Sequence, residues 1–206
     1  MLTLDCAKAS SSVAAEQERR EQILNAAGEY FRTYGFAKTT MGDLAKRIGF
    51  STAYLYRFFP SKQAIGEAVC AMTLARIGQA LQGICRSSQS ATAKIRSVFE
   101  CLVKKGIELF FRERKLHDIV VASAAGDWPS TRNHQAFISS ILHRIITQGR
   151  EAGEFERKTP IDEVCLAMLD AITCFSSPML LQNRERKELD ESVTAVSNLV
   201  LRSLAA

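Results

Sequence analysis

Residues 51–58 combine side chains that suit binding to a nucleic acid. The segment holds hydroxyl groups at Ser51, Thr52 and Tyr54 and a guanidinium group at Arg57. Hydroxyl and guanidinium groups donate hydrogen bonds to phosphate oxygens and to the edges of bases. If these side chains project from the exposed end of a helix, they can contact both a nucleic-acid backbone and its bases.

Two short helices with a tight turn between them can present such side chains. Thr40 is a candidate N-cap, Asp43 follows three residues later in the manner of a capping box, and Gly49 ends an apolar stretch of about two helical turns. Ser51 then offers a second N-cap, and Pro60 closes the segment that follows. Two short helices separated by a turn that contains glycine are typical of a helix-turn-helix.

The second short helix must bury one side against a core. The pattern predicts that Leu55, Phe59 and the ring of Tyr56 face inward. Four side chains then project from the other sides: Thr52, Tyr54, Arg57 and Phe58.

The basic charge of the chain is concentrated around this segment. The 206 residues carry a formal net charge of +5, and a composition of 47% hydrophobic and 24% charged residues is that of an ordinary globular protein. Residues 32–62 hold six basic residues and one acidic residue, which gives +5 for that stretch alone (6 − 1). Because residues 63–206 are nearly neutral, the excess points to a polyanionic partner of residues 32–62.

No motif in the sequence indicates an enzyme, a metal site or a cofactor. The sequence lacks a P-loop, a glycine-rich dinucleotide motif, a nucleophile elbow and a zinc-protease motif. The six cysteines form no C-x-x-C pair and lie at no short spacing from a histidine, which argues against zinc. The cysteines are then buried apolar residues, or one of them is a redox sensor.

The rest of the chain is predicted to be helical. Residues 1–15 are small and polar and are expected to form a flexible arm. No stretch has the ~20 apolar residues of a membrane-spanning helix and no signal peptide is apparent, so we expect a cytoplasmic protein without membrane contact. No convincing strand pattern appears, and the fold class is all-α with about nine helices. Besides the two short helices, apolar periodicity predicts helices at residues 17–34, 62–85, 92–112, 115–125, 130–151, 160–179 and 187–204.

The run TTMGDLAKRIGFSTAYLYRFFPSK at residues 39–62, preceded by ILNAAGEYFRTYGF at residues 23–36, resembles the DNA-binding domain of TetR-type (TetR/AcrR-like) bacterial transcriptional regulators. The resemblance implies a three-helix DNA-binding domain at residues 16–66 and an effector-binding and dimerisation bundle at residues 67–206. It further implies a homodimeric repressor that binds a near-palindromic double-stranded DNA operator and is released by a small-molecule effector of unknown identity.

The resemblance also implies which side chains contact DNA. Tyr56 and Lys62 match the phosphate-contacting tyrosine and lysine of the family, and Ala53 could contact a thymine methyl in the major groove. Position 58, often histidine in the family, is phenylalanine here. Lys46 either contacts the backbone or belongs to the solvated face of its helix. The DNA-contact candidates are Thr40, Lys46, Ser51, Thr52, Ala53, Tyr54, Tyr56, Arg57 and Lys62.

Two further sites follow from the resemblance, each with plain burial within the subunit as the alternative. A pocket is expected between the long helix at residues 62–85 and the helices at residues 92–151, and the last two helices are expected to form the dimer interface. The pocket candidates are Met72, Ile77, Phe99, Cys101, Val103, Phe110 and Trp128. The interface candidates are Leu166, Leu169, Ile172, Val193, Val196 and Val200.

Two other interpretations remain open at this point. The protein could be a regulator that senses thiol oxidation through Cys101 or Cys174, or a helical ligand-binding protein that has lost DNA binding. The hydroxyl groups of the second short helix, together with Tyr56 and Lys62, argue against the latter.

Overall fold

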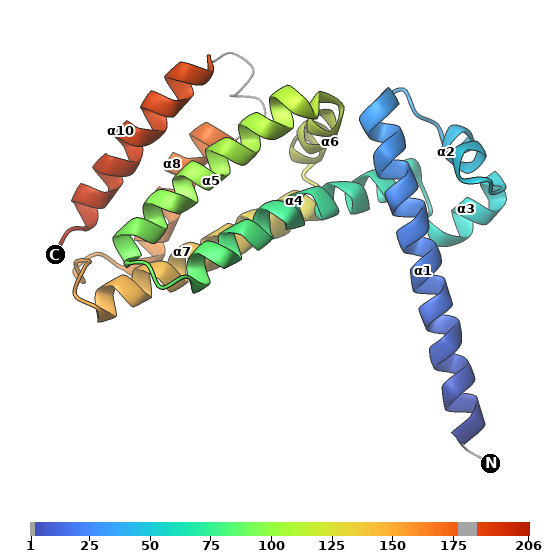
Figure 1. Ribbon diagram of the computed structural model, residues 1–206, viewed down its shortest axis with the longest axis horizontal. Helices are drawn as coiled ribbons and strands as arrows, with labels where there is room; N and C mark the ends of the chain where they lie inside the picture. The colour runs from blue at the N-terminus through green and yellow to red at the C-terminus, as the bar shows by residue number, and fades with distance from the viewer. Residues whose placement is uncertain (1–2, 177–184) are drawn as a thin grey trace.

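The computed structural model describes residues 3–176 and 185–206, and these residues form helices joined by turns (Figure 1). The all-α prediction is therefore confirmed, since β-structure in the described ranges is limited to one isolated bridge between Phe155 and Ala205. The helices are α1 (Thr3–Tyr34), α2 (Met41–Ile48), α3 (Thr52–Phe58), α4 (Lys62–Arg86), α5 (Ala91–Arg112), α6 (Arg114–Ala125), α7 (Pro129–Glu151), α8 (Ile161–Ser176) and α10 (Arg186–Leu204).

Helix α1 begins earlier than the apolar periodicity predicts. The chain is helical from Thr3, so residues 3–15, expected to form a flexible arm, continue the helix. Residues 13–19 are all exposed. Because no buried face repeats along this stretch, the pattern that identifies an amphipathic helix is missing there.

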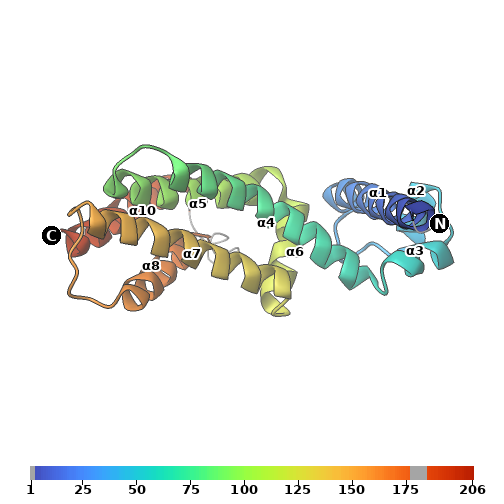
Figure 2. The same cartoon turned by 90° about the horizontal axis from the view of Figure 1, so that it is seen from below.

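Two hydrophobic cores form, and α4 connects them. Figures 1 and 2 show α1, α2 and α3 at one end of the molecule and α5, α7, α8 and α10 at the other, with α4 running between the two ends. The first core is centred on Phe31, Leu44 and Leu55, and it includes the first half of α4. The second core is centred on Phe99 and Leu142, and it includes the second half of α4.

Helix α6 joins the first core, although it follows α5 in the chain. Its residues Leu116 and Ile119 are buried in the first core, and α6 contacts both α1 and α4. Just beyond α6, the ring of Trp128 meets the Phe36 ring edge to face, with the two centroids 5.8 Å apart. The end of the chain segment 114–128 therefore packs against the connection between α1 and α2.

Helix α4 has the length and apolar composition of a helix that could cross a membrane. Its apolar residues are accounted for by its position, because α4 packs against α1, α5, α6 and α7. Leu74 in the first core and Leu81 in the second are both buried. The composition is therefore that of a central core helix.

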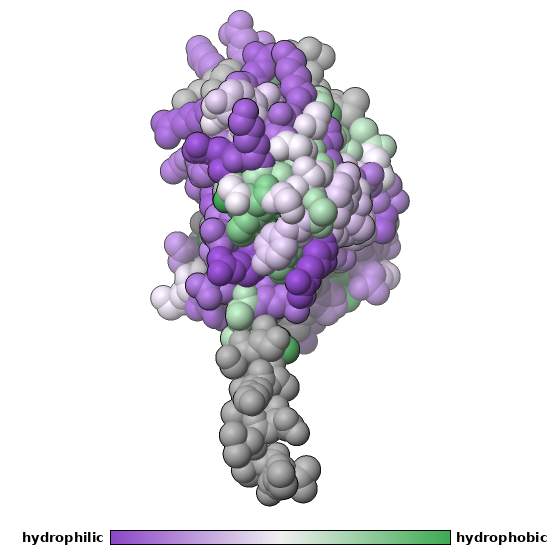
Figure 3. Space-filling view, turned by 90° about the vertical axis from the view of Figure 1, so that its right-hand side faces the viewer, coloured by the Kyte–Doolittle hydropathy of each residue, from purple (hydrophilic) through white to green (hydrophobic). Residues whose placement is uncertain are grey.

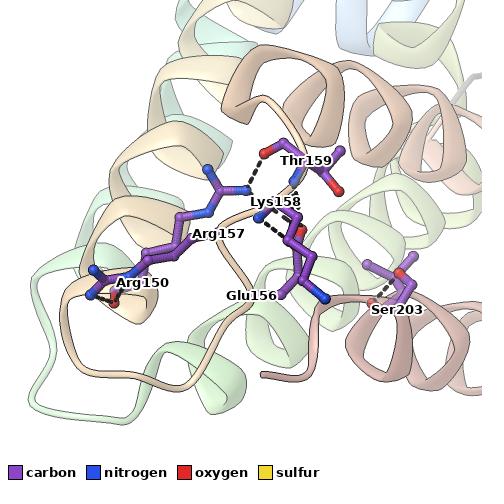
Figure 4. A network of polar contacts seen from close by, with 7 residues as sticks. Arg150, Glu156, Arg157, Lys158, Thr159 and Ser203 are labelled. Atoms are coloured by element: carbon purple, nitrogen blue, oxygen red, sulfur yellow. Dashed lines mark hydrogen bonds and ion pairs between the residues drawn. The ribbon is translucent and has the colours of Figure 1, made fainter.

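A polar network fixes the turn after α7 (Figure 4). Arg150 Nη2 donates to the Thr159 carbonyl oxygen at 2.6 Å, and the same nitrogen lies 3.7 Å from Glu156 Oε1. Arg157 Nε donates to the Arg150 carbonyl oxygen at 3.1 Å. Hydrogen bonds from Thr159 hold the pKa of the Glu156 carboxyl below its usual value. The network ties the start of α8 to the end of α7 and so closes the second core.

Candidate nucleic-acid interface and effector cavity

Helix α2 begins at a capping box. The Thr40 backbone N–H donates to Asp43 Oδ2 at 2.9 Å, and the Asp43 N–H donates to Thr40 Oγ1 at 3.2 Å. The Thr40 hydroxyl also donates to Asp43 Oδ2 at 2.6 Å, and these bonds lower the pKa of the Asp43 carboxyl. Because a hydroxyl has one proton, Thr40 cannot also donate to a phosphate in this arrangement. Thr40 can therefore donate to DNA, as its place among the DNA-contact candidates requires, only if the hydroxyl leaves Asp43.

Gly49 ends α2 and turns the chain toward α3. Its φ of +80° lies in the left-handed region, and its N–H donates to the Ala45 carbonyl oxygen. Ser51 then caps α3, because its Oγ accepts a hydrogen bond from the Tyr54 N–H at 3.1 Å. The Ser51 hydroxyl keeps its own proton as a donor for a phosphate oxygen.

The outer side of α3 carries most of the predicted contact residues. Leu55 and Phe59 are buried in the first core, as predicted. Tyr54 is half-buried, and its ring packs edge to face against the Phe50 and Phe58 rings, with centroids 4.9 and 5.1 Å away. The exposed residues are Ser51, Thr52, Ala53, Tyr56 and Arg57.

Tyr56 and Phe58 lie on sides opposite to those that the pattern predicts. Tyr56 is 50% exposed, whereas Phe58 is 8% exposed and belongs to the first core. The predictions of an outward Phe58 and an inward Tyr56 ring are therefore wrong. Residues three apart share a helix face, so Phe58 follows Leu55 inward, while Tyr56 is turned about 100° away from Leu55. An exposed Tyr56 hydroxyl suits the expected phosphate contact.

Lys62 is held by the connection between α1 and α2. Its Nζ donates to the carbonyl oxygens of Phe36 at 3.2 Å and of Ala37 at 3.3 Å, and lies 4.7 Å from the centre of the Phe36 ring. An ammonium group has three protons, so one is left for a phosphate oxygen. Lys62 therefore has a structural role that its position in the motif does not reveal.

Exposed basic residues surround the helix-turn-helix. Lys46 and Arg47 occupy the last turn of α2, and both are exposed, as are Lys38 and Arg57. Figure 3 looks onto this end of the molecule and shows hydrophilic residues around a paler central area. Positive charge around a group of hydroxyls is the arrangement that a phosphate backbone binds.

A cavity of about 130 Å³ lies where α4, α5, α6, α7 and α8 meet. Apolar side chains form most of its wall, and polar side chains come from α6, α7 and α8. The lining residues are Leu74, Ile77, Leu102, Gly106, Leu109, His117, Val120, Ala124, Thr131, His134, Gln135, Ile138, Leu169 and Thr173.

The predicted pocket residues are spread over several places. Ile77 lines the cavity. Phe110 lies against it, because its ring packs edge to face on the His117 ring with centroids 5.0 Å apart. The remaining five lie elsewhere: Phe99 and Val103 are buried in the second core, Trp128 is buried in the first core, Cys101 packs against the second core, and Met72 is exposed.

Two histidines of the cavity wall, His117 and His134, are not among the pocket residues predicted from the sequence. His117 is buried on α6 and His134 is half-buried on α7, and each follows an apolar helix face. Burial lowers the pKa of His134 to about 4, so the imidazole is neutral at neutral pH. A histidine within an apolar face is the signal that could have identified both residues.

The predicted interface residues also differ in their surroundings. Leu166 on α8 is 61% exposed, and Val196 and Val200 on α10 are half-buried. Ile172 and Val193 are buried in the second core, and Leu169 lines the cavity. Leu199, which belongs to the same apolar face of α10, is 68% exposed.

The cysteines whose side chains are described are poor candidates for redox sensing. Cys70, Cys85 and Cys165 are buried, and Cys101 is partly buried. Burial raises the pKa of the Cys101 thiol, whereas a sensor thiol needs a lowered pKa. The side chain of Cys174 lies outside the described residues. In the described part of the chain, no group of histidine, cysteine, aspartate or glutamate residues is arranged to hold a metal ion.

Comparisons with known proteins agree with this arrangement. The family described as bacterial regulatory proteins, tetR family, matches residues 23–69, and the family described as tetracyclin repressor-like, C-terminal domain, matches residues 91–197. The nucleoid occlusion factor SlmA of Vibrio atlanticus is 29% identical over 159 residues, covering 74% of this chain and 78% of its own. The HTH-type transcriptional regulator EthR of Mycolicibacterium smegmatis is 27% identical over 143 residues, covering 66% of this chain and 63% of its own.

Solved structures show the same fold. A TetR-family transcriptional regulator from Pectobacterium atrosepticum superposes with a TM-score of 0.77 at 21% identity, covering 94% of this chain and 97% of its own. The first family match falls on the helix-turn-helix, and the second spans more than half of the chain and includes α5, α6 and α7. The chain therefore belongs to the TetR family of bacterial transcriptional regulators, which bind operator DNA, respond to small-molecule effectors and act as dimers.

Proposed function

We propose that the chain is a repressor whose homodimer binds a near-palindromic operator and is released when a small molecule enters the cavity. In this proposal residues 16–66 read the DNA, and residues 67–206 bind the effector and dimerise. The protein works in the cytoplasm, where its operator is. The observation that carries the proposal is the position of α6, which contributes both to the first core and to the wall of the cavity.

One side of α6 packs in the first core, and another side faces the cavity. Leu116 and Ile119 pack in the first core, and His117 and Ala124 line the cavity. Because both sides belong to one rigid helix, a ligand that displaces the cavity wall displaces the support of the DNA-binding helices. Packed helices move as bodies, which makes α6 suited to carry this displacement.

Polar contacts fasten α6 to α1 as well. Arg32 Nη2 lies 3.4 Å from Glu113 Oε2, at the start of α6. The Lys115 ammonium group donates to the Thr33 carbonyl oxygen. These contacts join the C-terminal end of α1 to α6, so a shift of α6 changes the position of the DNA-binding domain relative to its dimer mate.

Ligand binding and operator binding are thermodynamically linked. A ligand weakens operator binding by as much as it prefers the arrangement that does not fit the operator. Coupling of about 1–3 kcal/mol, which corresponds to about 5- to 150-fold in affinity, is typical of such systems. Release of the operator over this range needs no unfolding of either domain.

At the operator, we assign the major groove to the start of α3 and the phosphates to its flanks. Ser51, Thr52 and Tyr54 would meet base edges or nearby phosphates, and Tyr56 and Lys62 would contact the backbone. The exposed residues of α3 support this assignment, because they combine hydroxyl and guanidinium donors with a small side chain at Ala53.

For the dimer, we assign the exposed apolar side chains of α8 and α10 to the interface with a second copy of the chain. Leu166 and Leu199 are among the most exposed large apolar residues, and α8 contacts α10 within the subunit. Exposed leucines on neighbouring helices are a surface that association would bury.

Fluorescence anisotropy with labelled DNA tests the repressor proposal. The intergenic DNA upstream of the protein's own gene is compared with a random duplex of equal length at several salt concentrations. We expect at least about a hundredfold preference for the intergenic DNA and an affinity that falls steeply as salt rises. Equal affinity for the two duplexes would contradict the proposal.

A further inference from the structure

The cavity wall carries no charged side chain among its described lining residues. An ammonium ligand would therefore find no carboxylate, and a carboxylate ligand would find no lysine or arginine. Burying an unpaired charge in such a place costs several kcal/mol in proteins, which exceeds what a few apolar contacts return. The wall selects for an uncharged ligand.

His134 is one of the side chains of the wall that can hydrogen-bond such a ligand, together with the exposed Gln135. The Thr173 hydroxyl donates to the Leu169 carbonyl oxygen at 2.8 Å, and the Thr131 hydroxyl is paired with that of Ser123. The His134 side chain makes no hydrogen bond within the described part of the chain. Burial lowers its pKa to about 4, so at neutral pH the imidazole offers one N–H donor and one nitrogen acceptor.

The volume of the cavity limits the size of the ligand. Its volume is about 130 Å³, and an engineered protein cavity of about 150 Å³ holds benzene. A single aromatic ring is therefore about the size of group that fits inside it. The surrounding side chains suit such a ring, because Leu74, Leu102 and Ile138 line the cavity from three helices.

We propose that the effector is an uncharged molecule about the size of one substituted aromatic ring, with a hydroxyl or carbonyl group that hydrogen-bonds to His134. This inference rests on the proposed function, because it names the class of molecule that would release the operator. The apolar wall binds the ring, and His134 fixes the orientation of the polar group.

A charge series of ring compounds tests the proposal on the unaltered protein. The probes are benzyl alcohol, benzoate and benzylammonium, which share the ring and differ in charge, and each is added while thermal unfolding is followed. We expect benzyl alcohol at ten times its Kd to raise the Tm by about 3 °C, and the two ions at the same concentration to leave it unchanged. A rise with either ion equal to that with benzyl alcohol, or no rise with any of the three probes, would overturn the proposal.

The role of His134 is tested by His134→Phe, which keeps a ring in the wall. Each Kd is taken from the concentration dependence of the Tm. We expect the ratio of the Kd for benzyl alcohol to that for toluene to increase about tenfold in the variant, because only the alcohol loses a hydrogen bond. The matched control is His143→Phe, an exposed histidine of the same helix, which should leave the ratio unchanged. An unchanged ratio in His134→Phe would overturn the assignment of the hydrogen bond.

Measurements of operator binding distinguish a failure of this inference from a failure of the proposed function. Benzyl alcohol should weaken binding to the intergenic DNA at least fivefold. If the protein prefers its intergenic DNA but no uncharged probe binds, the effector class is wrong and the repressor proposal stands. If benzyl alcohol binds in the cavity but the protein shows no preference for the intergenic DNA, the ligand class stands and the repressor proposal fails.

Discussion

Arg20 on α1 donates a hydrogen bond from Nη1 to the carbonyl oxygen of Phe58, at the end of α3, over 2.7 Å. The same guanidinium group lies 4.4 Å from the centre of the Phe59 ring. A cation at the C-terminus of a helix stabilises the partial negative charge of its last carbonyls. Arg20 therefore fixes the end of α3 to α1, and α3 keeps its direction relative to the rest of the domain.

We expect Arg20→Ala to weaken operator binding about 5- to 10-fold, because loss of this bond frees the end of α3 at a cost of about 1–1.5 kcal/mol. The measurement is anisotropy with operator DNA at fixed salt. Arg19→Ala is the matched control: it removes the same charge from the adjacent exposed residue, whose guanidinium group donates to the Gln22 side chain. Equal losses in the two variants would mean that the charge matters and the orientation of α3 does not.

Different residues of the DNA interface should control sequence preference and general affinity. Thr52→Ala removes a hydroxyl from the start of α3, so we expect discrimination between operator and random DNA to fall about tenfold. Lys62→Ala removes a point charge, so we expect affinity to fall by a similar factor for both duplexes. Anisotropy with each duplex provides the comparison, and Thr194→Ala on α10 serves as a distant control. If Lys62→Ala affects the operator alone, the two roles have been exchanged.

The sequence predicted the elements of the helix-turn-helix well, because their signals are local. A capping threonine, a glycine at positive φ and a capping serine each act within three or four residues, and the structure contains them at Thr40, Gly49 and Ser51. Which side of α3 faces the core was predicted only in part. Whether Tyr56 or Phe58 points inward depends on how α3 is turned against α1, and Arg20 fixes that contact from a distant part of the chain.

The cavity was harder to predict, for a related reason. An amphipathic helix shows which residues are buried, but it does not show whether they meet a core or an empty space. Phe99 and Ile77 both follow apolar periodicity, yet Phe99 fills the second core and Ile77 lines the cavity. Trp128 is another such case, because it packs on Phe36 through a contact between residues 92 positions apart (128 − 36).

Two glycines of long helices should respond oppositely to the same substitution. A Cβ at Gly149 on α7 would overlap the Phe155 ring and lie 2.8 Å from the Ala91 Cβ, whereas a Cβ at Gly83 on α4 meets nothing within 4 Å. We expect Gly149→Ala to lower the free energy of unfolding by about 1–3 kcal/mol, and Gly83→Ala to raise it by about 0.5–1 kcal/mol. Urea unfolding followed by circular dichroism measures both. A stabilised Gly149→Ala variant would show that Phe155 can move away at little cost.

His134 makes stability depend on pH above the range in which carboxylates titrate. Its pKa is lowered from 6.5 to about 4 by burial, so between these values the unfolded chain binds the proton and the folded chain does not. Stability is therefore complete above pH 6.5 and falls as the pH decreases toward 4. We expect a loss of roughly 2 kcal/mol between pH 7 and pH 5 from this residue.

The corresponding measurement is urea unfolding at pH 7 and pH 5 for the unaltered protein and for His134→Gln. The variant should lose most of the pH dependence, whatever its overall stability, and the exposed His143→Gln should retain it. Hydrogen-bonded carboxylates such as Asp43 and Glu154, whose pKa values are lowered from 3.8 and 4.5, lose their contribution only at lower pH. The same decrease in His134→Gln and in the unaltered protein would place the titrating group elsewhere.

The exposed leucines of α8 and α10 give the last prediction, on dimerisation. Leu166 and Leu199 are 61% and 68% exposed in the single chain, and a charged residue at either position would be buried without a partner in a dimer. We expect Leu166→Glu and Leu199→Glu each to raise the dimer Kd at least tenfold, measured by analytical ultracentrifugation. Operator affinity should fall as the dimer weakens, because separate subunits then bind the two half-sites independently.

Val13→Glu is the matched control for these variants. Val13 on α1 is an apolar residue that is 67% exposed, so the substitution adds the same charge to an equally open position outside α8 and α10. The dimer Kd of this variant should equal that of the unaltered protein. If all three substitutions weaken the dimer alike, net charge governs association and the α8 and α10 surface does not. If the two leucine variants stay fully dimeric, the second copy packs on a different face.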